Sequence, residues 1–173
     1  RQEDVALLGQ PLERDWRGAH DDWLGERSGE LRTGTGVLAS CGRALENFRT
    51  AGCTVESVVP AFDLAQLWNA WIDLRSFSVA GANAALYRNP ATQALLKPEA
   101  VWEIERGMRL SALQVYDAAR VRSAWYQVLR GLFEQFDFLV LPAAQVFPFD
   151  AGLDWPHEVG GRTMDTYHRW MEV

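Results

Sequence analysis

Three side chains near the carboxyl end are of types that bind metal ions. His157, Asp165 and His168 supply imidazole and carboxylate groups, and the spacing of Asp165 and His168 would place both on one face of a helix. A metal site needs a further ligand, and the neighbouring sequence does not supply one. We therefore predict no metal site and no other cofactor.

Nucleophilic catalysis is the second chemistry that the residue types allow. A Ser-His-Asp triad can assemble from distant positions, so a hydrolase with a dispersed triad stays open as an alternative. The strained Gly-x-Ser-x-Gly turn that exposes such a serine is absent from the sequence. Cys41 and Cys53 are expected to be buried, reduced thiols. His20, beside two aspartates, is expected in a solvated turn, and Gly34-Thr-Gly36 is expected to begin a helix.

Aromatic side chains are the other candidates for a binding surface. Several tryptophans recur at helical spacing among apolar residues, which favours packing in a core over a ligand pocket. These are Trp68, Trp71, Trp102 and Trp125.

The composition is that of a globular domain. The chain has 173 residues, of which 48% are hydrophobic, and a net charge of -6 without a basic cluster, which argues against nucleic acid as a partner. No apolar run reaches the roughly 20 residues of a membrane-spanning helix. We expect a soluble, cytoplasmic protein with no membrane partner. Because the chain begins with Arg1 and ends inside an amphipathic pattern, we also expect it to be part of a longer protein.

Periodicity predicts helices alternating with short strands, and hence the α/β class. Residues 1–22 are polar and are expected to form a loop or frayed end, followed by a short strand at Trp23-Leu24. The predicted helices cover residues 37–50, 64–80, 98–107, 111–135 and a final stretch from Thr163; the predicted strands cover 53–59 and 136–142. Asp63 with Gln66, and Ser111 with Gln114, have the capping-box layout. The nearly all-apolar strand at 136–142 is of the type buried on both faces.

Three segments in order resemble the amidase signature family. Tyr126 to Pro142 is similar to the family's long helix and following strand, with Phe136-Asp137 and Val140-Leu141-Pro142 matching its motif. Gly36 to Glu56 resembles the family's helix followed by an "Ala-Gly, Val-Glu" strand, and Met164 to Met171 resembles a later helix. The resemblance covers residues 36–173. It implies that residues 23–173 are a segment of a single amidase domain, a fragment of a layered fold with a mixed sheet flanked by helices.

The resemblance also implies an activity: hydrolysis of the C–N bond of carboxylic amides through an acyl-enzyme. The family uses a serine nucleophile, a second serine in a cis peptide and a lysine. This chain has no Ser-Ser pair, and its one lysine, Lys97, precedes Pro98 at a predicted helix start. We therefore predict that the chain contains no catalytic residue, that the triad lies outside it, and that Lys97 is a solvated surface residue.

The predicted contribution of this chain is to the substrate pocket. Ligands of open α/β sheets collect beyond the carboxyl ends of the strands. The loop after the strand at 136–142 is therefore the candidate, with a small-molecule amide as the substrate of the intact enzyme, and a Gln145→Ala change is expected to alter substrate preference. A homodimer is allowed, and the alternative function is a non-catalytic helical interaction or regulatory module. The candidate substrate-binding residues are Ala143, Ala144, Gln145 and Phe147.

Overall fold

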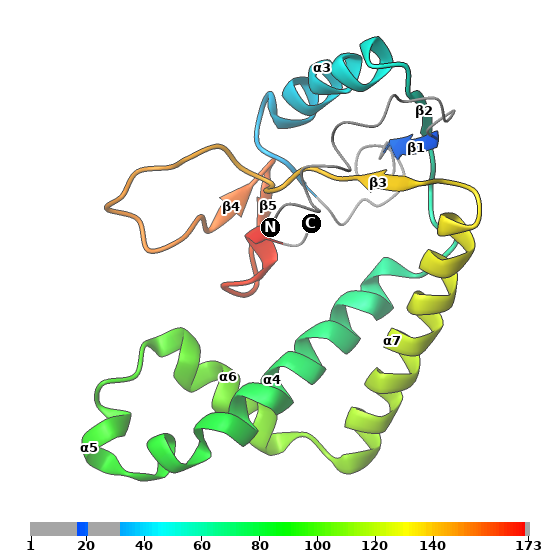
Figure 1. Ribbon diagram of the computed structural model, residues 1–173. Helices are drawn as coiled ribbons and strands as arrows, with labels where there is room; N and C mark the ends of the chain where they lie inside the picture. The colour runs from blue at the N-terminus through cyan, green and yellow to red at the C-terminus, as the bar shows by residue number, and fades with distance from the viewer. Residues whose placement is uncertain (1–16, 21–31, 172–173) are drawn as a thin grey trace, which may run out of the picture. The chain divides into compact units, whose positions relative to one another are not determined.

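The computed structural model describes residues 17–20 and 32–171, and the chain forms two compact units (Figure 1). The first unit combines Arg1–Val59 with Leu132–Val173, and the second is Pro60–Gly131. The second unit is therefore inserted in the sequence between two parts of the first. No helix within the described ranges is both long enough and apolar enough to cross a membrane.

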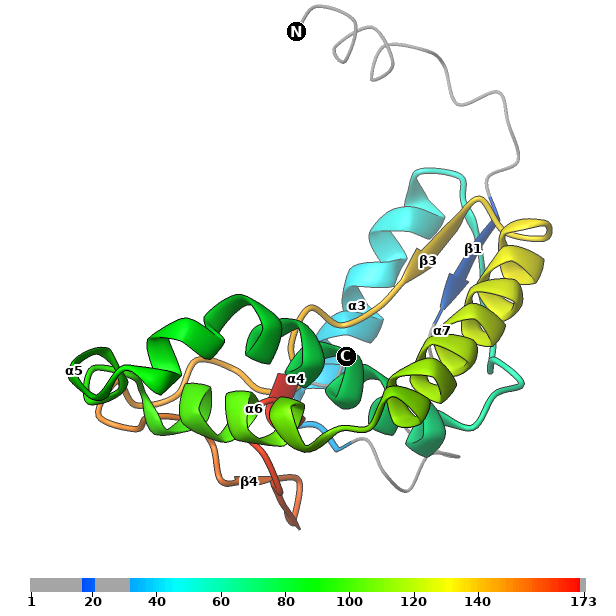
Figure 2. The same cartoon turned by 90° about the horizontal axis from the view of Figure 1, so that it is seen from below.

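The first unit is built on three short parallel strands. Strand β1 (Arg17–His20) lies between β2 (Thr54–Ser57) and β3 (Phe138–Val140), with Gly18 opposite both Val55 and Phe138. Helix α3 (Val37–Thr50) connects β1 to β2, as parallel pairing requires, and lies beside the strands in both views (Figures 1 and 2). The carboxyl ends of all three strands consequently meet at one edge of the sheet.

Two glycines set the ends of α3. Gly36, the residue before the helix, has a φ of 87°, and Gly52, just after it, has a φ of 91°. Gly52 N–H donates to the Arg49 carbonyl, and Cys53 N–H donates to the Phe48 carbonyl, the two bonds of a Schellman end. The predicted helix at 37–50 is confirmed.

The second unit is helical. It contains α4 (Leu64–Arg88), α5 (Pro90–Gln93), α6 (Pro98–Arg109) and most of α7 (Ala112–Phe133). The backbone N–H of Gln66 donates to Asp63 Oδ1 at 3.0 Å. Ser111 and Gln114 make the two reciprocal bonds of a capping box, at 2.9 and 3.2 Å. Both predicted helix starts are therefore confirmed.

Helices α4 and α6 pack against each other through a glycine. A Cβ added at Gly107 would lie 2.0 Å from the Ser76 carbonyl oxygen and 2.6 Å from Ala80 Cβ. Ile104 and Ser76 are fully buried in the second unit. Only a residue without a side chain allows the two backbones to come this close.

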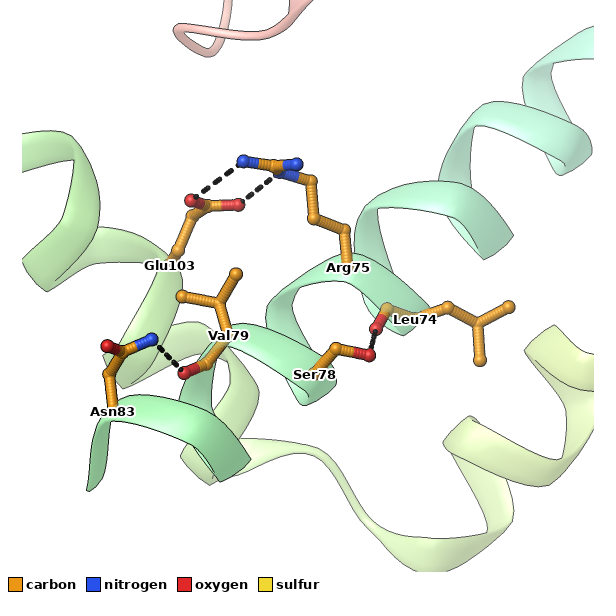
Figure 3. A network of polar contacts seen from close by, with 6 residues as sticks. All are labelled: Leu74, Arg75, Ser78, Val79, Asn83 and Glu103. Atoms are coloured by element: carbon orange, nitrogen blue, oxygen red, sulfur yellow. Dashed lines mark hydrogen bonds and ion pairs between the residues drawn. The ribbon is translucent and has the colours of Figure 1, made fainter. Parts of the chain in front are cut away.

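Two arginine–carboxylate pairs join the same helices. Arg75 Nε donates to the buried Glu103 at 2.6 Å (Figure 3), and Arg106 pairs with Asp73. The guanidinium of Arg75 lies 5.6 Å from the ring centre of Trp71, and that of Arg106 lies 5.9 Å from that of Trp102.

The prediction that these tryptophans pack in a core is wrong for two of them. Trp68 is buried and Trp125 is half-buried, but Trp71 and Trp102 are partly exposed, with 43% and 37% of their surface open to solvent. A paired arginine lies over each exposed ring, and a cation over an aromatic face favours this placement at the surface.

Helix α4 continues eight residues beyond its predicted end at Ala80, to Arg88. A Cβ at Gly81 would meet nothing within 4 Å, so this glycine weakens the helix without serving another contact. Asn83 Nδ2 donates to the Val79 carbonyl at 2.9 Å, one turn back along the helix (Figure 3). The asparagine therefore bonds within the helix instead of ending it.

Three further predictions need correction in the first unit. The loop predicted for residues 1–22 contains strand β1. This strand is stabilised by pairing with a neighbour on each side, so its own polar sequence does not predict it. Strand β3 is at the edge of the described sheet, and Phe138 is 54% exposed, so β3 is not buried on both faces. The final helix from Thr163 is reduced to a 3-10 turn, η1 (Arg169–Met171), because Thr163 ends a strand. The strand predicted at Trp23-Leu24 lies outside the described residues.

Candidate functional site

The candidate loop leaves the carboxyl end of β3. Residues 141–149 contain no helix or strand and include Pro142 and Pro148. Because β3 is parallel to its neighbour, this loop begins at the edge where the carboxyl ends of the strands meet. That edge is where ligands of open α/β sheets bind.

Gln145 is the buried centre of this loop. Its side chain is 1% exposed, and Nε2 donates to the Arg32 carbonyl at 2.8 Å. Its own carbonyl accepts from the Gly34 N–H at 2.7 Å. The loop is thus bonded to the segment that begins α3, although more than a hundred residues separate the two in sequence.

Two glycines lie against the loop at distances where an added Cβ would make an ordinary contact. A Cβ at Gly34 would lie 3.6 Å from the Gln145 carbonyl oxygen, and one at Gly36 would lie 3.7 Å from the Phe147 ring. The backbone at position 36, just before α3, is left-handed, a conformation that favours glycine. The predicted helix start at Gly34-Thr-Gly36 is confirmed. Gly34 and Gly36 also contact the 143–147 loop.

A hairpin supplies the third part of this junction. Strands β4 (Glu158–Val159) and β5 (Arg162–Thr163) are antiparallel and joined by Gly160 and Gly161, both with positive φ. A Cβ on Gly160 would lie 2.9 Å from the Thr33 carbonyl oxygen. The segment 32–36 is therefore in contact with both the 143–147 loop and the hairpin turn.

The remaining candidate residues present an apolar surface. Ala143 is exposed, Ala144 is half-buried, and Phe147 is 53% exposed. Phe149 follows and packs edge-to-face against Trp170, with ring centres 5.4 Å apart. The described part of the loop thus offers apolar and aromatic contact to a ligand, with the amide of Gln145 turned inward.

The sequence-predicted metal-binding types do not converge. His157 is exposed and pairs with Asp154 at 3.4 Å, whereas Asp165 pairs with Arg169 at 3.1 Å. His168 is buried, and residues 164–168 are not helical, so the one-face spacing argument does not apply. In the ranges 17–20 and 32–171, no three His, Cys, Asp or Glu side chains are grouped to hold a metal ion.

Two carboxyl groups near this hairpin have lowered pKa values. A hydrogen bond from the Trp155 backbone N–H lowers the pKa of Asp154, with a smaller contribution from His157. Partial burial acts to raise the pKa of Asp165, but the hydrogen bonds and charge of Arg169 outweigh it and lower this pKa. Both groups are therefore charged at neutral pH and are unsuited to act as general acids there.

Several side chains of types that can act as nucleophile or base are exposed or take part in helix hydrogen bonds. Lys97 is exposed at the start of α6, as predicted. Ser78 and Ser123 donate to helix carbonyls one turn back, and Ser111 caps α7. These three serine hydroxyls are therefore engaged in hydrogen bonds within helices or at a helix start.

The sequence predicts a loop after the strand at 136–142, but not the residues that hold this loop in place. Arg32 and Gly34 lie in a glycine-bearing stretch that the sequence marks only as a loop and helix start, and the Gly160-Gly161 turn lay within a predicted loop. Paired glycines between two short polar runs are the available hairpin signal.

Comparison with known proteins finds likeness in structure but not in sequence. No protein-family model matches the chain, and no curated protein matches it in sequence. A bacterial aryl acylamidase of the amidase signature family superposes with a TM-score of 0.75 at 18% identity, over 92% of this chain and 34% of its own. An amidase superposes with a TM-score of 0.72 at 18% identity, over 92% and 35%.

A third structure is a vestigial protein complex, in an inhibitor-bound form, that bears on the origins of an s-triazine catabolic enzyme. It superposes with a TM-score of 0.73 at 19% identity, over 97% of this chain and 35% of its own. The chain thus spans about a third of the length of the structures it matches. The resemblance to the amidase signature family is confirmed in the fold: the chain is folded like one part of these enzymes, with a helix-rich unit and small sheets.

Proposed function

We propose that this chain is a part of an amidase that hydrolyses carboxylic amide C–N bonds, and that it forms one wall of the substrate pocket. The supporting observation is the superposition of 92% of the chain on two amidase structures, together with the loop at the carboxyl edge of its parallel strands. Residues 23–173 would then be a segment of a single amidase domain, in which the two compact units are parts of one layered fold.

In this proposal the bond is broken by residues outside the chain. A serine attacks the amide carbonyl, a second serine and a lysine carry its proton to the leaving amine, and water then releases the acid from the acyl-enzyme. The chain has one lysine, at the start of α6, and no adjacent serines. Its role is to shape the pocket through residues 143–147.

The sheet is consistent with a missing neighbour. Strands β2 and β3 are the two edges of the described sheet, and Phe138 and Leu141 are exposed on and after β3. An edge strand presents unpaired backbone N–H and C=O groups, which complete domains usually pair or cover. Further strands of the intact enzyme, giving the predicted mixed sheet, would pair with these edges.

A hydrolysis assay tests this proposal. The purified 173-residue chain and the product of the gene's full reading frame are incubated with simple amides and anilides, and release of ammonia or amine is measured. Hydrolysis by the longer product alone is the expected result. Hydrolysis by the chain itself would overturn the placement of the catalytic residues outside it.

The alternative, a non-catalytic helical interaction module, draws on a different observation. The second unit exposes aromatic side chains on α4 and α6, among them Trp71, Phe77 and Trp102. Failure of both products to hydrolyse any amide would favour this alternative.

A further inference from the structure

Two residues of the candidate loop have opposite surroundings. The side chain of Gln145 is 1% exposed and bonded to the Arg32 carbonyl at 2.8 Å, whereas Phe147 is 53% exposed. Because almost none of the Gln145 side chain is exposed, its amide is not open to a substrate, whereas about half of the Phe147 side chain is. The two residues therefore cannot serve the substrate in the same way.

We propose that Gln145 is a positioning residue, that Phe147 is the specificity-determining residue it positions, and that Phe147 favours aromatic amides over aliphatic ones. This inference deepens the proposed function and rests on it. The sequence predicts substrate binding for the whole loop, whereas this inference gives Gln145 and Phe147 separate roles.

The geometry explains how Gln145 would act on Phe147. The Gln145 side chain and its own carbonyl bond to Arg32 and Gly34, which fixes the loop against the segment that begins α3. Phe147 is two residues further on, and its ring lies 3.7 Å from the Cβ position of Gly36. With one side against Gly36, the ring keeps its exposed part for a ligand.

The exposed ring determines the class of substrate. Offset or edge-to-face aromatic pairs gain affinity beyond the area they bury, by an amount that corresponds to roughly 2- to 12-fold. An anilide can form such a pair with Phe147, whereas acetamide has no ring. We therefore expect the ratio of kcat/KM for acetanilide to that for acetamide to depend on Phe147.

A double-mutant cycle on the product of the full reading frame tests both roles. Phe147→Leu, which keeps the bulk but not the ring, should lower the acetanilide-to-acetamide ratio by roughly 2- to 12-fold. Gln145→Ala should lower it in the same direction, and in the Phe147→Leu background it should have no further effect on the ratio. A Gln145→Ala effect that persists in this background would show that Gln145 contacts the substrate, and would overturn the proposal.

Hydrogen exchange on the 173-residue chain tests the positioning role without any activity. The Gly34 N–H donates to the Gln145 carbonyl. Gln145→Ala, and Gln145→Glu as a variant of equal size without the donor, should speed its exchange by about tenfold or more. Gln135→Ala, at an exposed glutamine of the same unit, should leave it unchanged.

The two experiments fail in distinguishable ways. Unchanged exchange at Gly34 in both Gln145 variants would overturn the role of Gln145. An unchanged ratio in Phe147→Leu would overturn the role of Phe147. Absence of hydrolysis by the unmodified full-length product would overturn the proposed function and the specificity role with it, while the exchange result would still decide whether Gln145 holds the loop.

Discussion

Gly107→Ala should destabilise the second unit although alanine is the better helix former. A Cβ at this position would lie 2.0 Å from the Ser76 carbonyl oxygen, 2.6 Å from the Ser76 carbonyl carbon and 2.6 Å from Ala80 Cβ. All three atoms belong to the backbone or first side-chain atom of α4, so none can rotate away. The helices must separate instead.

The size of the effect follows from that separation. Contacts shorter than 3.0 Å are essentially never found for a real Cβ, so the Ser76 oxygen must retreat by about 1 Å from its 2.0 Å position. A gap of this size forfeits a quarter to a half of the dispersion energy between facing atoms, and overpacking typically costs about 1–3 kcal/mol. Alanine returns about 1 kcal/mol through helix propensity. We expect a net loss of up to about 2 kcal/mol.

Urea unfolding, with hydrogen exchange of α4 and α6 amides to locate the change, measures this loss. Gly81→Ala is the matched control, because it lies on α4 and its Cβ would meet nothing within 4 Å. That variant should gain about 0.5–1 kcal/mol. The reasoning is refuted if Gly107→Ala is as stable as Gly81→Ala, since the helices would then not be in close contact at this glycine.

Three further changes have defined outcomes. Ser76→Ala should stabilise the second unit by about 1 kcal/mol in urea unfolding, because the buried Ser76 hydroxyl has no hydrogen-bond partner. The lowered pKa of Asp165 means that its pairing with Arg169 stabilises the fold above the ordinary carboxyl pKa of 3.8 and is lost as the pH falls through the lowered value. The melting temperatures of wild type and Asp165→Asn should therefore differ at pH 7 and converge below pH 3.8; a constant difference would contradict the pairing. Gly160→Ala should cost about 1 kcal/mol or more, because φ is positive there and the added Cβ would lie 2.9 Å from the Thr33 oxygen, and faster exchange in the hairpin would report it.

Local patterns predicted the elements whose causes are local. The helix at 37–50 has both its glycine ends and its apolar period in the sequence, and the Ser111–Gln114 box needs only a spacing of three. Strand β1 could not be predicted in this way, because it is stabilised by β2 and β3, which lie far along the chain. The extension of α4 past Gly81 was missed because a side-chain bond from Asn83 supports the helix there.

In the candidate site, too, features with local causes could be predicted from the sequence and features that depend on distant residues could not. The apolar pattern at 136–142 predicts a strand followed by a loop, which the structure has, whereas the role of that loop in binding a substrate stays a prediction. The inward direction of Gln145 depends on the Arg32 carbonyl, a partner at a sequence separation of 113 that no periodicity encodes. The exposure of Trp71 and Trp102 depends in the same way on ion pairs between two helices.

Covalent labelling tests the central claim most directly: this chain belongs to an amidase whose nucleophile lies elsewhere. The purified chain and the product of the full reading frame are treated with a fluorophosphonate, which modifies activated serines, and intact masses and peptide maps are recorded. We expect one adduct on the longer product, at a serine outside the 173 residues, and none on the chain. An adduct on any serine of the chain, or no adduct on the longer product, would contradict the account.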